Sequence, residues 1–166
     1  MRTSVLLFSL GWLFLLNSCA SPKYLPSYQE IDVNTHGSYI KVTGPNIKIV
    51  QGELIALNNE KMIILSEENN QCQIVPLKEI NKFTLQYAQT KSYGWSVPVF
   101  TAVSLAHGLA AIFSLPINLI TTSAVTIGGE SEFKYRGKKQ LSYEDLKMFA
   151  RFPQGIPPNI SIDRIK

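Results

Sequence analysis

The chain has 166 residues and a formal net charge of +4 at pH 7. This length suits one modest domain with an attached element, not several domains. The positive excess is small and dispersed, so it does not favour a nucleic-acid partner. Two cysteines are too few for a scaffold held together by disulfides.

An apolar run follows Arg2 and ends at Leu16-Asn17-Ser18-Cys19. The run is too short to span a bilayer comfortably and is typical of a cleaved signal peptide. Its end resembles the lipobox of bacterial lipoprotein precursors. The resemblance implies that residues 1–18 are removed and that Cys19 becomes the acylated N-terminus. The alternatives are an ordinary secretory peptide and an uncleaved anchor with an incidental cysteine.

Residues 19–34 contain prolines, serines and tyrosines without helix or strand periodicity, so we expect a lipidated N-terminus followed by a linker. In the lipoproteins that the chain resembles, acidic residues after the cysteine act as a retention signal. Ala20 and Ser21 are not acidic, which favours the outer membrane, facing the periplasm, over the inner membrane. Lipidation of Cys19 would leave Cys72 unpaired, and we expect a buried strand thiol there.

Residues 35–91 contain five short runs of the β type, separated by turn residues. The runs cover 38–43, 47–57, 62–66, 72–75 and 83–87. Alternation along them gives the expected core positions. These are Ile47, Ile49, Leu54, Ala56, Met62, Ile64, Cys72, Ile74, Phe83 and Leu85. Gly52 would permit a sharp bend inside the longest run.

The run 52–57, its hairpin into 61–65 and the segment 75–80 resemble the small SH3-like and Sm-like barrels in pattern. This resemblance implies an α+β fold: a small five-stranded β-barrel, then an apolar helical element and a short mixed tail. It does not identify a function, because such barrels serve many functions.

No Asp, Glu, Lys or Arg occurs between residues 92 and 129. One straight helix of that length would be about 57 Å long, roughly twice a bilayer's hydrocarbon core, so the segment must break. His107-Gly108 and Leu115-Pro116 are the candidate breaks. Small and weakly polar residues recur at helical spacing and form a possible helix-packing stripe. The stripe comprises Ser104, His107, Ala111, Ser114, Asn118 and Thr121.

Three arrangements of residues 92–129 remain open. The favoured one is a membrane-associated helical hairpin, which fits a lipid anchor and a barrel on one side of the bilayer. Alternatively, the helices pack on the barrel or on a partner. A single crossing is the third arrangement, and the basic residues after Gly129 favour it because cytoplasmic segments are enriched in Lys and Arg.

Residues 130–166 form the tail. Ser142 and Asp145 resemble a capping box and predict a short helix over 142–152, followed by a proline-rich loop. Apolar and polar residues alternate over residues 160–165, which predicts an edge strand. Basic residues cluster earlier in the tail, and we interpret them as a solvated strand or turn face in preference to an anionic-lipid contact. They are Lys134, Arg136, Lys138 and Lys139.

Neither histidine belongs to a recognisable catalytic or metal-binding pattern. His107 has no acidic residue nearby, and Asp32 and His36 would share a face only in a helix, which the residues around them do not support. We therefore predict no catalytic residues, no metal and no cofactor.

The sequence predicts a non-enzymatic scaffold or binding module of the bacterial cell envelope. It would be held in the membrane by acylated Cys19 and by residues 92–129, with an unidentified envelope protein as its partner. The alternative is an envelope enzyme or transport component that uses the apolar segment around His107.

Overall fold

The computed structural model describes residues 22–31, 35–45, 47–91 and 93–166. The chain divides into two compact units. We call Pro22–Gln89 with Phe133–Lys166 the sheet domain, and the helical segment between them, within Thr90–Glu132, the hairpin. The predicted signal peptide, residues 1–18, and Cys19 lie outside the described residues.

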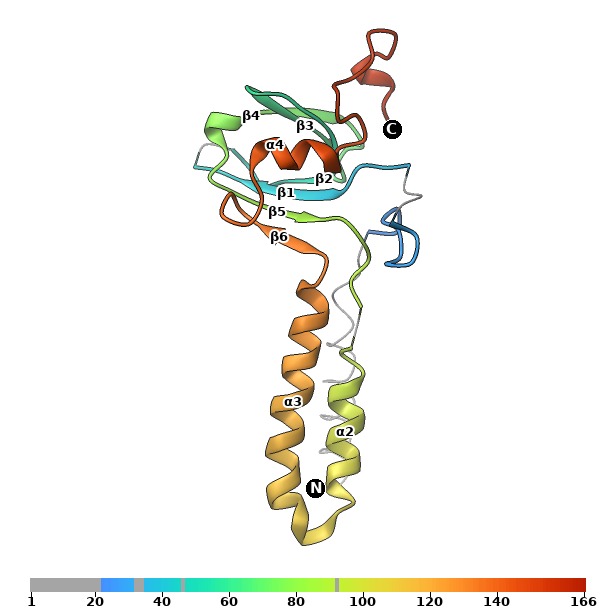
Figure 1. The fold of residues 1–166 in the computed structure, drawn as a ribbon, viewed down its shortest axis with the longest axis vertical. Helices are drawn as coiled ribbons and strands as arrows, with labels where there is room; N and C mark the ends of the chain where they lie inside the picture. The colour runs from blue at the N-terminus through green and yellow to red at the C-terminus, as the bar shows by residue number, and fades with distance from the viewer. Residues whose placement is uncertain (1–21, 32–34, 46, 92) are drawn as a thin grey trace. The chain divides into compact units, whose positions relative to one another are not determined.

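The sheet domain contains a six-stranded antiparallel sheet with the strand order β4-β3-β2-β1-β5-β6 (Figure 1). The strands are β1 (Tyr39–Thr43), β2 (Val50–Leu57), β3 (Lys61–Ser66), β4 (Cys72–Pro76), β5 (Lys82–Gln86) and β6 (Lys134–Arg136). The α+β class and the five expected strands are confirmed. The tail supplies a sixth strand, and the sheet is open, so a closed five-stranded barrel is not confirmed.

A short connection forces the open sheet to curl. Strands β4 and β5 lie four strand spacings apart, about 19 Å in a flat sheet. Only residues 77–81 join them, and they include the 3₁₀ helix η2 (Leu77–Glu79). A segment with that turn reaches about 16 Å. Leu77 N donates to Glu60 O over 2.8 Å and Asn81 N donates to Thr43 O over 2.9 Å, so the connection runs from the β2–β3 turn to the end of β1.

Strand β2 carries the irregularities that accompany this curvature. A Cβ atom at Gly52 would collide with the carbonyl oxygen of Leu65, so glycine lets β3 approach closely. The register between β2 and β3 shifts between Leu54 and Ala56. Such bulges bend the strand that contains them and increase its twist.

The sheet is covered by different segments on its two faces. The main core includes Leu54, Ile64 and Leu85, each fully buried, together with Leu146 from the tail. The second core lies on the other face, where Ile55 and Ile63 pack against the C-terminal segment. Strands β2 and β3 are therefore buried on both faces, which removes the simple alternation of apolar and polar residues.

Most of the expected core positions are buried, but two are not. Leu54, Ala56, Met62, Ile64, Phe83 and Leu85 are buried, and Ile47 packs partly buried against the main core. Cys72 is half-buried against the second core. The predictions for Ile49 and Ile74 are wrong, because these side chains are 58% and 51% exposed. Ile49 precedes β2, and in β4 Val75 faces the main core, opposite Met62.

The predicted tail helix begins as expected and ends early. Asp145 N donates to Ser142 Oγ over 3.1 Å, which caps α4 (Tyr143–Leu146). The 3₁₀ helix η4 (Lys147–Phe149) follows, and Ala150 is extended. Arg151 N and Phe152 N then donate to the β2 carbonyls of Leu54 and Ile55. Pairing with β2 therefore replaces the last part of the helix predicted over 142–152.

The predicted edge strand over 160–165 is absent from the described tail. The 3₁₀ helix η5 (Ile162–Arg164) occupies that region. Ile160, Ile162 and Ile165 cover the second core with their side chains, and no strand pairing is needed. Part of the predicted linker is also ordered: Leu25 is only 2% exposed, and Gln89 hydrogen bonds to the carbonyls of Leu25 and Pro26.

Candidate functional site

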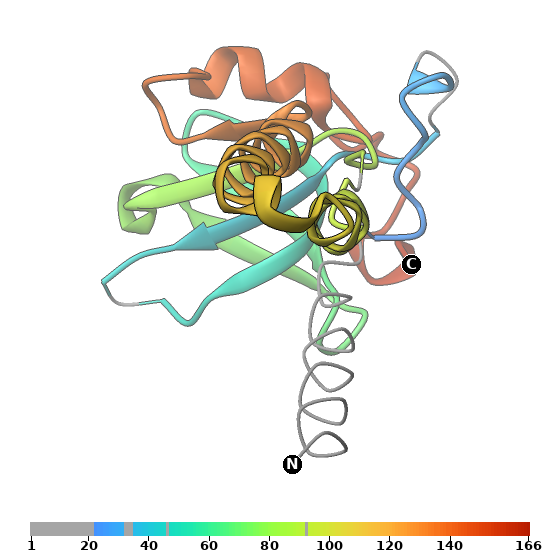
Figure 2. The same cartoon turned by 90° about the horizontal axis from the view of Figure 1, so that it is seen from below.

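The hairpin consists of two helices that lie side by side, α2 (Ser96–Leu105) and α3 (Ala111–Ser131) (Figures 1 and 2). The 3₁₀ helix η3 (Gly108–Ala110) joins them. Gly108 has a φ of +58°, a left-handed conformation that favours glycine, and it ends the first helix as predicted. The predicted break at Leu115-Pro116 is wrong, because α3 continues through Pro116.

Polar side chains meet between the two helices. Asn118 Nδ2 donates to Ser104 Oγ, whose own hydroxyl donates to Phe100 O over 2.7 Å. Near the connecting turn, His107 Nδ1 lies 3.2 Å from Ser114 Oγ. We call Ser104, His107, Ser114 and Asn118 the polar seam. Ser104 comes from α2, His107 from the connecting turn, and Ser114 and Asn118 from α3, so the seam joins α3 to α2 and to the turn by side-chain hydrogen bonds.

The structure places the two remaining stripe residues differently. Ala111 is half-buried where α3 begins, whereas Thr121 is exposed and donates to Ile117 O of its own helix. Thr122 is buried instead, at 7% exposure. Spacings of three and four residues are compatible with position 121 and with position 122. The sequence alone therefore does not indicate which of the two threonines faces the other helix.

At the other end of the hairpin, the two chain segments are held by an aromatic ring and a charge pair. A Cβ atom at Gly129 would collide with the ring of Tyr93, so glycine makes room for this ring. Thr126 Oγ1 also approaches Tyr93 O, at 3.3 Å. Lys91 Nζ lies 3.9 Å from Glu132 Oε2. Charged groups thus flank a segment that contains none.

The outward surface of the hairpin is apolar. The stretch Gly108–Gly129 has a mean hydropathy of 1.6, and only 6% of its apolar window is buried. Large exposed side chains occur along both helices. They are Val99, Phe100, Val103, Leu105, Leu109, Ile112, Phe113, Ile117, Leu119, Ile120, Val125 and Ile127. The helix α3 has 21 residues, which corresponds to about 32 Å and matches a hydrocarbon core of about 30 Å.

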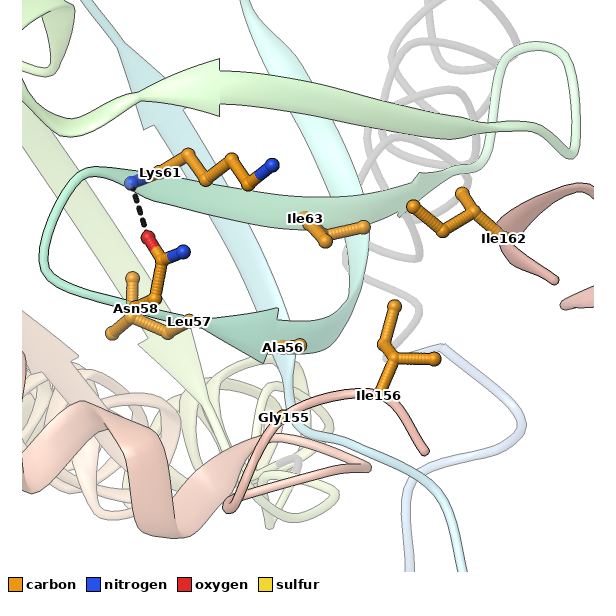
Figure 3. A pocket seen from close by; sticks show the side chains of 8 residues that line it. All are labelled: Ala56, Leu57, Asn58, Lys61, Ile63, Gly155, Ile156 and Ile162. Atoms are coloured by element: carbon orange, nitrogen blue, oxygen red, sulfur yellow. Dashed lines mark hydrogen bonds between the residues drawn. The ribbon is translucent and has the colours of Figure 1, made fainter. Parts of the chain in front are cut away.

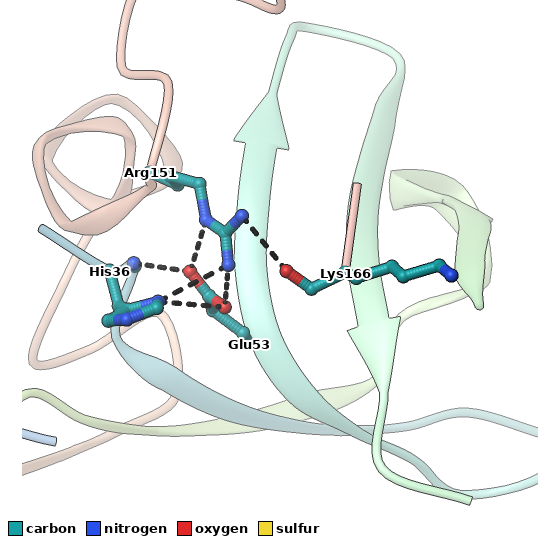
Figure 4. A network of polar contacts seen from close by, with 5 residues as sticks. His36, Glu53, Arg151 and Lys166 are labelled. Carbon is teal, nitrogen blue, oxygen red and sulfur yellow. Dashed lines mark hydrogen bonds and ion pairs between the residues drawn. The ribbon is translucent and has the colours of Figure 1, made fainter. Parts of the chain in front are cut away.

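A second polar cluster lies in the sheet domain, around Glu53 on β2 (Figure 4). Glu53 is 4% exposed and accepts from Gly37 N over 2.6 Å and from Arg151 Nε over 2.7 Å. Arg151 Nη2 donates to its other oxygen, and Arg151 Nη1 donates to Lys166 O. His36 Nδ1 lies 3.7 Å from this carboxylate. Each carboxylate oxygen of Glu53 already accepts a hydrogen bond, so this residue is not poised as a general base.

The pKa shifts around this cluster follow from burial and from its charges. The hydrogen bond to Glu53 raises the pKa of the Arg151 guanidinium, so Arg151 stays charged. Burial and the negative charge of Glu53 raise the pKa of Tyr24, whose hydroxyl has no hydrogen-bond partner among the described residues. Burial also raises the pKa of the Cys72 thiol, which disfavours the reactive thiolate.

The sheet domain also has an apolar groove of about 220 Å³ between β2, β3 and the C-terminal segment (Figure 3). Ala56, Ile63, Ile156 and Ile162 line it, and Lys61 N donates to Asn58 Oδ1 over 2.7 Å at one end. Convergent charged side chains of a catalytic centre are absent from its lining. No group of three metal-ligating side chains occurs among the residues that the structure describes.

Sequence reasoning missed the Glu53 cluster, although one signal was present. Glu53 is a charged residue inside an otherwise apolar strand, and such residues are buried only with a partner. Its partner Arg151 is 98 positions away, so pairing could not be inferred from spacing. The chain matches no family model, no curated protein and no solved structure.

Proposed function

We propose that this protein is a lipid-anchored, non-enzymatic scaffold or binding module of the bacterial cell envelope, and that its hairpin inserts into the bilayer. The exposure of the apolar helices carries the proposal. A core helix of a soluble protein is mostly buried, whereas 6% of the window in Gly108–Gly129 is buried. Lipid tails would cover this surface while the polar seam stays satisfied inside.

The sheet topology favours a hairpin over a single crossing. Strand β5 precedes the hairpin, strand β6 follows it, and the two strands pair from Gln86 and Lys134 onward. Adjacent strands of one sheet must lie on the same side of a bilayer. A hairpin that enters and leaves through one surface meets this requirement, whereas a single crossing would separate β5 from β6.

The lipid anchor and the hairpin would attach the sheet domain close to the same place. Cys19 precedes the buried Leu25 by six residues, which span at most about 20 Å. Leu25 and Pro26 hydrogen bond to Gln89, the last residue before the hairpin unit. Two membrane attachments give stable anchoring, whereas one acyl chain is marginal.

The curled sheet supports the finer proposal of an SH3-like barrel architecture. In such a barrel, the bent strand β2 would run across both halves of the sheet. The sheet domain would then hold a binding surface at the membrane for an unidentified envelope protein. The residues after Cys19 favour the outer membrane, facing the periplasm, and the inner membrane is the alternative.

Membrane extraction tests the proposal. The mature chain with Cys19→Ala, exported through an ordinary signal peptide, should still sediment with membranes after an alkaline carbonate wash, because the hairpin alone holds it there. Recovery as a folded, soluble periplasmic monomer would refute insertion. A clickable fatty acid should label the wild type and spare Cys19→Ala, and equal labelling of both would refute the lipid anchor.

A further inference from the structure

The sheet face opposite the main core is divided into two parts. The C-terminal segment covers it over β2, β3 and β4, where the second core lies. Over β1, β5 and β6 the same face carries polar residues, because Ile40, Val42, Phe83 and Leu85 point into the main core and their neighbours point away.

Strand register brings basic residues from three distant parts of the sequence together on this polar part. Lys41 pairs with Thr84, and Thr84 pairs with Arg136 on its other side. Lys82 and Lys134 lie two positions along their strands from this row. Strand spacing and rise place the four Cα atoms within about 15 Å of one another. We call Lys41, Lys82, Lys134 and Arg136 the basic face.

The charges of the basic face are uncompensated within the described parts of the chain. None of the four takes part in an ion pair, and Lys41, Lys82 and Arg136 are exposed. Two acidic side chains lie beside this face. Glu53, opposite Tyr39, is neutralised by Arg151, and the carboxylate of Glu67 accepts a hydrogen bond from the Tyr39 hydroxyl. The four positive charges of the basic face therefore outnumber the one neighbouring carboxylate that no ion pair neutralises, Glu67.

The position of Lys82 and Lys134 in the chain favours one kind of partner. Lys134 follows the hairpin unit by two residues, and Lys82 precedes it by eight. Basic residues beside a membrane-inserted segment are held within reach of lipid headgroups and are each worth about a fivefold gain in affinity for an anionic surface. Resting on the proposed insertion, we propose that the basic face binds the headgroups of anionic phospholipids.

Lipid retention by the full chain tests this proposal. Wild-type protein is reconstituted with equal amounts of phosphatidylglycerol and phosphatidylcholine, captured in a neutral detergent, and the retained lipids are quantified by mass spectrometry. We expect phosphatidylglycerol to be enriched at least about fivefold. The triple variant Lys41→Gln, Lys82→Gln, Arg136→Gln should lose this enrichment.

A matched triple variant controls for net charge. Lys61, Lys78 and Arg164 are also two lysines and one arginine, are exposed, and belong to other parts of the sheet domain. Their change to Gln should leave the enrichment intact. Equal lipid ratios for wild type and the basic-face variant would overturn the proposal and leave an acidic protein as the partner. Carbonate extraction of the same variants in the Cys19→Ala background separates this failure from failure of insertion, because membrane attachment then depends on the hairpin alone.

Discussion

The sheet domain and the hairpin distribute polarity in opposite ways. In the sheet domain, Ile64 and Leu85 are fully buried, and Glu53 is the one charged residue that is buried among those the structure describes. In the hairpin, Ser104 is fully buried, whereas Ile120 is 72% exposed. The two regions thus expose surfaces of opposite polarity, and this difference is what the proposed insertion of the hairpin into an apolar phase requires.

Hydrogen bonding within the hairpin fits the same contrast. Thr101 Oγ1 donates to Val97 O and Thr122 Oγ1 donates to Asn118 O, each over 2.7 Å. These hydroxyls bond to the preceding turn of their own helix and need no water. A segment with many Ser and Thr residues can thereby present an apolar exterior.

The largest effect is expected from a charge in the main core. Ile64→Asp should lower the free energy of unfolding of the sheet domain by about 3–5 kcal/mol, because an unpaired charge becomes buried. That is comparable to the stability of a small domain. Denaturation of the detergent-solubilised full chain, followed by circular dichroism, measures it. Ile74→Asp is the control in the neighbouring strand, and its half-exposed side chain should tolerate the change.

A charge on the outside of the hairpin should affect insertion. Ile120→Asp should lower the inserted fraction about a hundredfold, since an aspartate near the middle of a spanning helix costs about 3 kcal/mol. The carbonate-resistant fraction in the Cys19→Ala background measures this. Ile49→Asp, at a 58% exposed isoleucine of the sheet domain, is the matched control. Equal extraction of the two variants would mean that both regions face the same solvent.

The polar seam should contribute a smaller energy. Asn118→Leu removes the hydrogen bond to Ser104 and should destabilise helix pairing by about 1 kcal/mol. Thr121→Val changes an exposed residue of the same predicted stripe and should have little effect. The two variants are compared by the loss of their helical circular-dichroism signal as the concentration of a denaturing detergent is raised. A larger effect of Thr121→Val than of Asn118→Leu would contradict this helix interface, because it would mean that Thr121 and not Asn118 faces α2.

The smallest effect concerns the sheet domain at alkaline pH. Burial, the charge of Glu67 and a hydrogen bond to Glu67 raise the pKa of Tyr39 from 10.0 to about 12. The neutral phenol is therefore favoured by folding, and this contribution is fully present below pH 10 and disappears as the pH rises to about 12. Ultraviolet titration should show a late phenolate phase that Tyr39→Phe removes. Ionisation of Tyr39 near pH 10 would contradict it.

The strands of the sheet domain could be predicted because turn residues and alternating apolar positions agreed along the chain. Prediction failed where tertiary contacts decide. Alternation along β4 was assigned to the wrong face of the sheet, so Ile74 was predicted to be in the core. In the structure Val75 is the buried residue, opposite Met62. The edge strand over 160–165 was predicted from alternation, but its isoleucines cover a second sheet face that local pattern does not reveal.

The candidate site was predictable in composition and only partly in geometry. The absence of charge over 92–129 and the spacing of Ser104, His107, Ser114 and Asn118 were visible in the sequence, and the structure brings these four residues together. Thr121 and Thr122 could not be distinguished. Lys134 and Arg136 were visible in the sequence as part of a basic cluster, but Lys41 and Lys82 become their neighbours only through strand register, so the whole basic face could not be predicted.

The placement of the hairpin between β5 and β6 sets the order in which the molecule can be assembled. Leu141, Leu146 and Ala150 of the main core, together with Arg151, the partner of Glu53, are made after the hairpin. A nascent chain that has reached only Glu132 lacks them, and it cannot complete the sheet domain. The domain therefore finishes folding only after its apolar helices have been synthesised, so the most hydrophobic segment of the chain is present before the core around Leu146 can close.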